Sequence, residues 1–369
     1  MLSLVLLGRF VYSLNWFIIS PALPDIASAG RIPLWALGLI PFAFFLSTGA
    51  FQIPSGALSG RLGAVRTYVI GLAVLSAGNV LLPLDPSAAW VMLTRVVSGV
   101  GSAFFFASAA GVLLGLYPER PGLMMGLYNT AFGLGGAGGL LWGTVHQAIG
   151  WQAGVALGGL LGMAVAAVNY GFVRGVDVKG RYSARDAVKM LGDRGLVVPA
   201  LAFAGTWGSY FAVGQLLPAY QQTVLGSGVA RSGLETSLLL FSSIVGGLSS
   251  AVYDRTGRRK LLMLSAGALA VLPIVLIGAM GGALILPSLV AMGFFNEMAI
   301  SMFYAFVNDR VPSGAAAALA MINTVQITLG MLFFPVLSFT SAVFSWEVGW
   351  AVLGVGSALP LLLMARVKV

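Results

Sequence analysis

Long apolar runs separated by short polar turns are the main pattern along the chain. Most runs are continuous over about 20 residues, the length that an α-helix needs to cross the hydrocarbon core of a bilayer. A membrane β-barrel is excluded, because its strands would alternate apolar and polar residues over about ten positions. The pattern therefore predicts twelve transmembrane helices: 2–24, 34–56, 67–84, 88–116, 122–148, 152–173, 196–223, 233–253, 261–281, 284–307, 315–341 and 348–365.

The composition places most of the chain in lipid. Of its 369 residues 59% are hydrophobic and 8% are charged, whereas a soluble domain has about 25% charged residues. The chain has no Cys and one His, His146, so we expect no metal, no cofactor and no catalytic residue. His146 fits an interfacial position at the end of a span. The first 26 residues contain Arg9 and no small-residue cleavage site, so we expect no cleavable signal peptide.

Basic residues gather on alternate loops. With the N-terminus in the cytoplasm, sixteen of the twenty Lys and Arg residues fall in cytoplasmic segments, and only Arg31 and Arg231 fall in outer loops. This asymmetry follows the positive-inside rule. We expect a multi-pass protein of the cell membrane with both termini in the cytoplasm. Membrane lipids with anionic headgroups then supply the counter-charge to the net charge of +9, without any nucleic acid.

The chain contains a gapless internal repeat at an offset of 194 residues. Matching positions are Pro24 and Pro218, Arg61 and Arg255, Gly63 and Gly257, Gly99 and Gly293, Pro118 and Pro312, Asn129 and Asn323, Thr130 and Thr324, and Gly136 and Gly330. Six spans per repeat give both halves the same orientation, so a pseudo-two-fold axis along the membrane normal is expected. We predict an N-terminal six-helix bundle over 1–173, a cytoplasmic linker over 174–195 and a C-terminal six-helix bundle over 196–369.

Three short motifs follow or lie within particular spans. They comprise Gly56, Gly60, Arg61, Gly63 and Arg66 after the second span, Asp254, Arg255, Gly257, Arg258 and Arg259 after the eighth, and Arg95, Gly99 and Gly101 in the fourth. Glycines let the two loops reverse tightly while the bases contact headgroups. Small residues in the fourth span permit close helix packing beside a single charge.

These motifs, the spans and the repeat resemble the major facilitator superfamily of secondary transporters over the whole chain. The two loops resemble its G-x-x-x-D-R-x-G-R-R signature, and the Arg95 segment resembles its fourth-span R-x-x-x-G-x-G pattern. The resemblance implies a path lined by spans 1, 4, 7 and 10. It also implies a cytoplasmic gate formed by Arg61, Arg120, Asp254, Arg255 and Arg258. Two features depart from the family: Gly60 replaces the acid of the first loop, and the fifth span lacks the Gly-Pro pair of drug/proton exchangers.

Three ionisable residues lie inside spans that the resemblance assigns to the path. Arg9, Arg95 and Glu297 each cost at least about 2.5–3.5 kcal/mol in hydrocarbon, so each requires a reason. We assign Glu297 to proton coupling and the two arginines to an anionic substrate. Structural alternatives stay open: Arg9 snorkelling to the headgroups, Arg95 in a buried pair or packing role, and Glu297 as a neutral hydrogen-bonded acid.

Further polar and aromatic residues complete the candidate site. Glu297, Ser301 and Tyr304 share one helix face, as do Arg9, Tyr12 and Trp16, because of their spacing. The predicted substrate-binding residues are Arg9, Asn15, Arg95, Trp207, Tyr210, Gln215, Asn296 and Tyr304. Gln52 fits a structural or a binding role, and Asn129 and Asn323 fit helix–helix hydrogen bonding better than substrate contact.

The leading functional hypothesis is a secondary transporter that works by alternating access. Two buried arginines against one glutamate favour proton-coupled uptake of a small anion, so the expected partners are an anionic small-molecule substrate and protons, and we expect a monomer. The alternative is proton-coupled export of amphipathic compounds against an aromatic wall. No ATP-binding G-x-x-x-x-G-K-[ST] sequence occurs. A channel would need filter loops, and an integral-membrane enzyme would need clustered catalytic groups; the sequence favours neither.

Overall fold

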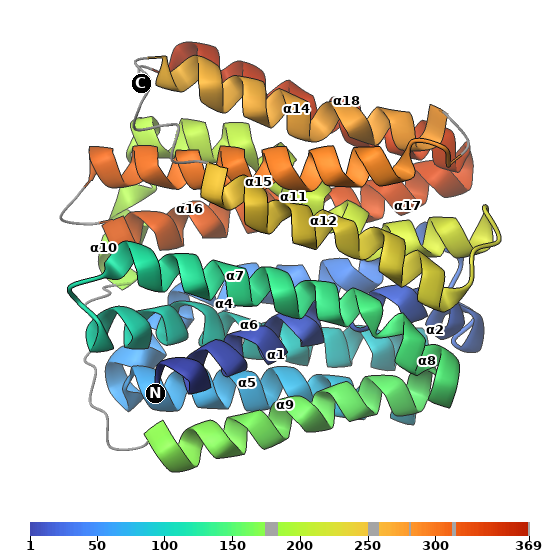
Figure 1. Ribbon diagram of the computed structural model, residues 1–369, viewed down its shortest axis with the longest axis horizontal. Coiled ribbons are helices and arrows are strands. Elements are labelled where there is room, and N and C mark those ends of the chain that lie inside the picture. The colour runs from blue at the N-terminus through green and yellow to red at the C-terminus, as the bar shows by residue number, and fades with distance from the viewer. Residues whose placement is uncertain (174–183, 250–257, 280–281, 312–314, 368–369) are drawn as a thin grey trace.

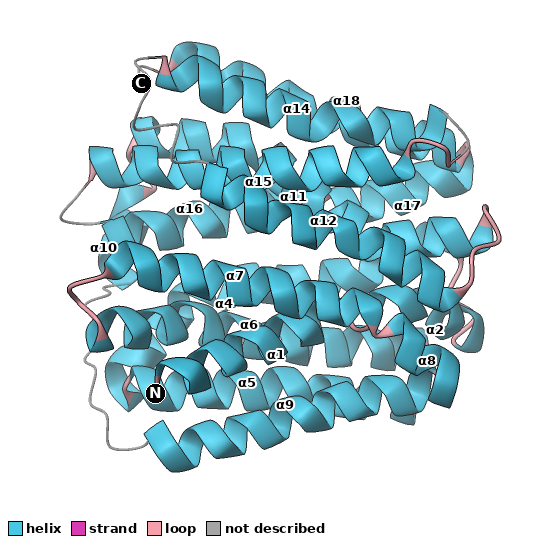
Figure 2. Cartoon of the chain, viewed as in Figure 1, coloured by secondary structure: helices cyan, strands magenta, loops and turns pink. Residues whose placement is uncertain are grey.

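The computed structural model describes residues 1–173, 184–249, 258–279, 282–311 and 315–367, and this part of the chain is helical, without a strand (Figure 2). The first half, residues 1–173, contains α1 (Leu2–Phe17), η1 (Ser20–Ala22), α2 (Leu23–Ala29), α3 (Leu34–Leu37), α4 (Leu39–Leu62), α5 (Ala64–Leu81), η2 (Leu82–Leu84), α6 (Ala88–Leu116), α7 (Pro121–Leu141), α8 (Gly143–Ile149) and α9 (Trp151–Val173). The second half, residues 194–367, contains α11 (Arg194–Thr223), α12 (Val229–Ser249), α14 (Arg259–Ala279), α15 (Ile285–Arg310), α16 (Ala315–Gly330), α17 (Phe333–Val343), α18 (Trp346–Ala358) and η4 (Leu359–Arg366). Between them, α10 (Ala184–Met190) lies within the predicted linker, of which 174–183 falls outside the described residues.

The predicted all-α membrane class is confirmed. Among the described residues, ten helical segments are long and apolar enough to cross a membrane, and they coincide with ten of the twelve predicted stretches. The other two stretches correspond to α7 with α8 and to α12. α7 packs against α1, and α12 packs against α15. Twelve crossings remain a prediction.

Prolines shape the helices in two ways. α1 gives way to the 3-10 turn η1 and then to α2 where Pro21 and Pro24 lack the N–H that an α-helix needs. In contrast, α11 is continuous through Pro199 and Pro218. The missing N–H of Pro218 leaves the carbonyl oxygen of Gly214, four residues earlier, free to bond elsewhere.

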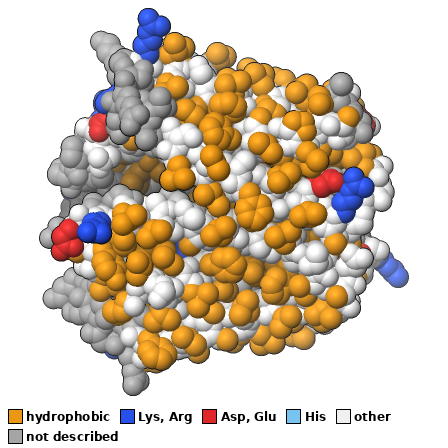
Figure 3. All heavy atoms as spheres, viewed as in Figure 1, with side chains coloured by type: hydrophobic (Ala, Val, Ile, Leu, Met, Phe, Trp, Pro, Cys, Tyr) orange, Lys and Arg blue, Asp and Glu red, His pale blue; other side chains and the backbone are white. Residues whose placement is uncertain are grey.

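Both termini lie at one end of the helical bundle, which we call the terminal end (Figure 1). The connection from α6 to α7 lies at the same end, and the long helices run from there toward the opposite end. The visible surface is mainly apolar across its middle and carries charged side chains toward both ends (Figure 3). Large apolar side chains are exposed on the outside, such as Phe172 at 73% and Leu248 at 71%. Such a surface suits lipid tails, which are as apolar as the side chains themselves.

Four hydrogen bonds, which we call the clasp, join α1 and η1 of the first half to α11 of the second half. The clasp consists of Ser20 Oγ donating to Gly214 O and Gln215 O (both 2.8 Å), Gln215 Nε2 donating to Trp16 O (3.0 Å) and Gln222 Nε2 donating to Pro21 O (2.9 Å). Within the described residues, the hydrogen bonds between the two halves all lie toward the opposite end.

Glycines bring the two halves into backbone contact at this same end. A Cβ at Gly38 would overlap a backbone carbonyl of α17, and a Cβ at Gly233 would overlap a backbone carbonyl of α7. A larger residue at either position would push the halves apart. The opposite end is therefore closed by direct contact between the two halves.

Candidate functional site: a central cavity between the halves

A cavity lies between the two halves, next to the clasp along α1 and α11. It encloses about 710 Å³ of empty space, counting the part that opens to solvent. Its lining residues come from α1, α4, α6 and α7 of the first half and from α11, α15 and α16 of the second half: Arg9, Tyr12, Trp16, Gln52, Phe106, Asn129, Phe132, Trp207, Tyr210, Phe211, Asn296, Glu297, Ile300, Tyr304, Asn323 and Ile327. All four spans that the resemblance assigned to the path contribute to it.

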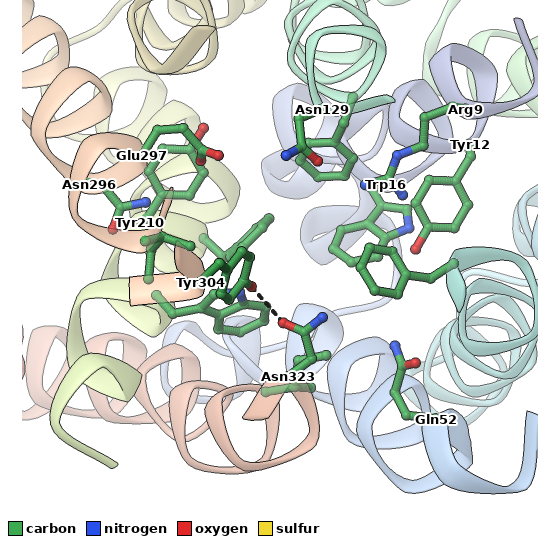
Figure 4. Close-up of a pocket in the computed structure, with 16 residues that line it drawn as sticks. Arg9, Tyr12, Trp16, Gln52, Asn129, Tyr210, Asn296, Glu297, Tyr304 and Asn323 are labelled. Carbon is green, nitrogen blue, oxygen red and sulfur yellow. Dashed lines mark hydrogen bonds between the residues drawn. The ribbon is translucent and has the colours of Figure 1, made fainter. Parts of the chain in front are cut away.

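Arg9 lines the cavity within a group of four rings that we call the aromatic cage. Its guanidinium carbon lies 4.1 Å from the ring centroid of Tyr128, 4.5 Å from that of Phe132, 4.9 Å from that of Tyr12 and 5.1 Å from that of Phe106. Ring faces attract a cation, each by about 0.5–2 kcal/mol. The cage therefore offsets the buried charge, and the side chain points into the cavity rather than toward the headgroups (Figure 4).

Glu297 lies on the wall across the cavity from Arg9, with Asn296 and Tyr210 beside it (Figure 4). Within the described residues it forms no ion pair or hydrogen bond. On the same face of α15, Tyr304 donates a hydrogen bond to Asn323 Oδ1 of α16 at 2.7 Å. An ionised carboxylate without a partner is costly in a medium of low dielectric constant. Glu297 is thus a group that would hold a proton or a cationic ligand.

Arg95 lies outside this cavity, in a hydrogen-bond network that joins α1, α5, α6 and α9. It is 1% exposed, its Nη1 donates to Asn79 Oδ1 of α5 at 2.8 Å, and its guanidinium lies 4.6 Å from the ring centroid of Phe44. Asn79 donates to Asn15 Oδ1 at 2.8 Å, and Asn15 donates to Gly158 O of α9 at 3.2 Å. The geometry favours the packing role for Arg95 and draws Asn15 into the same network.

The structure thus divides the predicted site residues into two groups. Those that line the cavity are Arg9, Trp207, Tyr210, Asn296, Glu297 and Tyr304. Those that bond elsewhere are Asn15 and Arg95, in the network, and Gln215, in the clasp.

Several cavity residues were not among the predicted binding residues. Tyr12, Trp16, Gln52, Asn129 and Asn323 line the cavity, and the sequence does carry signals for them: the stripe shared with Arg9 and the repeat-related asparagines. No comparable signal marks the apolar lining residues. An apolar side chain in a membrane helix looks the same in the sequence whether it faces lipid, packs against another helix or lines a substrate path.

Three of the predicted gate residues are described, and they lie apart from the cavity. Arg61, Arg120 and Arg258 are exposed, whereas Asp254 and Arg255 lie outside the described residues. In the part of the chain that the structure describes, no group of three or more His, Asp and Glu residues could hold a metal ion.

Comparison with known proteins decides the family. The model of the Major Facilitator Superfamily matches residues 5–335. The chain belongs to this superfamily. It is therefore a multi-pass membrane protein, and the resemblance seen in its motifs is confirmed.

Several relatives in this superfamily are named for efflux or resistance. Multidrug efflux protein YfmO of Bacillus subtilis is 30% identical over 212 residues, covering 56% of this chain and 52% of that protein. Methylenomycin A resistance protein of Bacillus subtilis is 26% identical over 157 residues (41% and 33%), and multidrug resistance protein Stp of Mycobacterium tuberculosis is 27% identical over 155 residues (42% and 26%). The chain matches about half or less of the length of each of these relatives.

Proposed function

We propose that this superfamily member is a secondary transporter that couples proton movement to the export of amphipathic aromatic compounds. The observation that carries the proposal is the central cavity, whose walls are largely aromatic and contain one unpaired acid, Glu297. Aromatic faces accept varied flat apolar bodies. The carboxyl group holds either a proton or the cationic group of a substrate. Because the two compete for one group, binding of one releases the other, which is an exchange.

Uptake of a small anion, the leading hypothesis from the sequence, has less support. That hypothesis needs two arginines that face the path. Only Arg9 lines the cavity, whereas Arg95 is engaged in the packing network. The names of the relatives, an efflux protein and two resistance proteins, also favour export.

We infer that the two halves are six-helix bundles related by a pseudo-two-fold axis. Ser20 bonds to Gly214, its own counterpart at the offset of 194, and two equivalent residues can touch only near the axis that relates them. A Cβ on Gly99 of α6 would meet the backbone of α4, and a Cβ on Gly293 of α15 would meet the backbone of α12 in the corresponding place. Both observations support rocking of one half against the other.

We further propose that the terminal end faces the cytoplasm of the cell membrane and that the protein works as a monomer. The basic loops support this orientation. A cavity built between two halves of one chain supports the monomer. With the clasp formed, the structure corresponds to the state that is open to the cytoplasm.

Proteoliposomes carrying a pH gradient test the proposed coupling. We expect wild-type protein to accumulate an amphipathic dye against its gradient, and Glu297→Gln to lose this accumulation while it still exchanges labelled for unlabelled dye, because an amide takes up no proton. Glu347→Gln, which changes an exposed acid, is the matched control and should behave as wild type. Unchanged accumulation by Glu297→Gln would remove Glu297 from the mechanism. Absence of exchange in wild-type protein would contradict a carrier.

A further inference from the structure

The two walls of the cavity carry single charges of opposite sign. Arg9 projects from α1 of the first half and Glu297 from α15 of the second half, and the cavity separates them (Figure 4). Within the described residues neither group forms an ion pair. When Glu297 is ionised, the cavity therefore presents opposite charges on its two walls to whatever enters it.

The wall on the side of Arg9 offers hydrogen-bond donors. The aromatic cage contacts the faces of the guanidinium, whose N–H groups all lie in its plane. Arg9 Nε and Nη1 have no hydrogen-bond partner in the described structure, and the same holds for Trp16 Nε1. Arg9 is 3% and Trp16 5% exposed. Buried donors without a partner cost free energy, so an acceptor group of a ligand placed here would be bound favourably.

The wall on the side of Glu297 offers an acceptor. The Glu297 carboxyl group accepts hydrogen bonds from a cation or binds a proton. The rings of Trp207 and Phe211 also line the cavity, with centroids 4.4 Å apart, and they provide a face for a flat apolar body. A ligand that spans the cavity would thus find a donor wall, an aromatic surface and an acceptor wall.

We propose that the preferred substrates are zwitterionic aromatic compounds. The carboxylate or other acceptor group binds at Arg9 and Trp16, and the cationic group binds at Glu297. A purely cationic compound leaves Arg9 unneutralised and close to a like charge, and a purely anionic one does the same to Glu297. This inference rests on the proposed export function and adds to it the charge distribution of the substrate.

A pair of matched dyes tests the inference directly. Rhodamine 110 has a cationic xanthene and a free carboxylate, and rhodamine 123 is its methyl ester, which retains only the cation. Fluorescence anisotropy with purified protein near neutral pH gives both affinities. We expect wild-type protein to bind rhodamine 110 at least about tenfold more tightly, which corresponds to about 1.4 kcal/mol.

Four variants locate the preference. Arg9→Gln should weaken rhodamine 110 alone and bring the two affinities within about twofold of each other, whereas Glu297→Gln should weaken both dyes. Arg31→Gln removes a charge from an exposed arginine in a loop at the opposite end and should keep the wild-type ratio. Arg9→Lys retains the charge without the planar donors and should give an intermediate ratio of the two affinities. This variant also tests the role of Arg9 if Arg9→Gln does not fold.

The outcomes separate this inference from the proposed function. Binding of rhodamine 123 by wild-type protein as tightly as rhodamine 110 would overturn the zwitterion preference and leave export of amphipathic compounds intact. A preference for rhodamine 110 that survives in both Arg9 variants would also overturn it. Binding of neither dye would count against both the inference and the proposed function.

Discussion

At the opposite end of the bundle the two halves are joined by hydrogen bonds and stacked rings, whereas at the terminal end there is open space beside the glycines of α4 and α7. Ser338 Oγ adds a bond to Trp35 O at 3.0 Å, and the rings of Phe45 and Phe334 stack across the halves with centroids 4.9 Å apart. A Cβ on Gly60 of α4 would meet nothing within 4 Å. Within the described residues, the hydrogen bonds that join the two halves thus lie toward the opposite end.

This difference shows how a closed end can remain able to open. The clasp consists of neutral hydrogen bonds, each worth about 0.5–1.5 kcal/mol net, and no ion pair in the described residues joins the two halves. A total of a few kcal/mol lies in the range that shifts a two-state equilibrium. Trp16 connects the clasp to the cavity, because its carbonyl accepts from Gln215 while its ring lines the cavity. A ligand that moves this ring acts on the closed end directly.

The largest expected effect concerns which end faces the cytoplasm. In this chain without Cys, Ser227→Cys lies in the loop between α11 and α12 at the opposite end, and Ser183→Cys lies in the linker. An impermeant thiol reagent added to intact cells should label Ser227→Cys and leave Ser183→Cys unlabelled, because the proposed orientation, based on the basic loops, places the linker in the cytoplasm. Labelling of Ser183→Cys from outside would invert the assignment of the two ends.

The next effect concerns the clasp. Gln215→Leu removes the donor to Trp16 O and leaves that carbonyl without its partner, a loss of about 1–3 kcal/mol. We expect the population with an open opposite end to rise by roughly fivefold to a hundredfold. Spin labels at Arg31→Cys and Ser227→Cys report this as a longer distance across that end.

A neighbouring glutamine of α11 provides the matched control. Gln221 donates to Glu235 Oε2 at 2.6 Å and accepts from Thr236 at 3.1 Å, and both partners belong to its own half. Gln221→Leu therefore loses comparable bonds without touching the clasp, and its distance distribution should match the parent. Identical distributions for Gln215→Leu and Gln221→Leu would show that the clasp does not hold the end closed.

The smallest effect concerns the terminal end. By the repeat, Asp254, which lies outside the described residues, should face the start of α7 when that end closes, whereas Gly60 offers no equivalent attraction. A carboxylate at a helix N-terminus contributes about 0.3–1 kcal/mol, and up to about 2 when partly buried. Asp254→Asn should favour the state open at the terminal end and Gly60→Asp the reverse, each by up to roughly tenfold. Labels at Glu119→Cys and Leu261→Cys would detect both shifts. An unchanged distance distribution in Asp254→Asn would show that Asp254 is an ordinary loop residue.

The sequence predicts the helical membrane class, the family and part of the site. Apolar runs determine the spans, because lipid requires backbone hydrogen bonds to be satisfied within each helix. Glu297 and Arg9 stand out for a related reason, since a charge in hydrocarbon needs a function or a partner. Both lie on the cavity walls.

The sequence could not predict which way each polar side chain faces around the axis of its helix. Arg95 satisfies the same criterion as Arg9, yet it faces α5 and Asn79 instead of the cavity. Gln215, a predicted binding residue, donates a hydrogen bond to the backbone carbonyl of Trp16 in the other half. Which partner a polar side chain meets depends on how two distant segments pack, and the apolar periodicity of a membrane helix leaves that undetermined.

Measuring the distances across both ends in the same protein tests alternating access most directly. The Arg31/Ser227 pair and the Glu119/Leu261 pair, each labelled in wild type and in Gln215→Leu, give the populations open at the opposite and the terminal end. We expect wild type to be mainly short across the opposite end and long across the terminal end. In Gln215→Leu we expect more molecules with a long distance across the opposite end and fewer with a long distance across the terminal end. The two populations should change by equal amounts. Long distances at both ends together, or a change at one end without the other, would contradict a single cavity that opens to one side at a time.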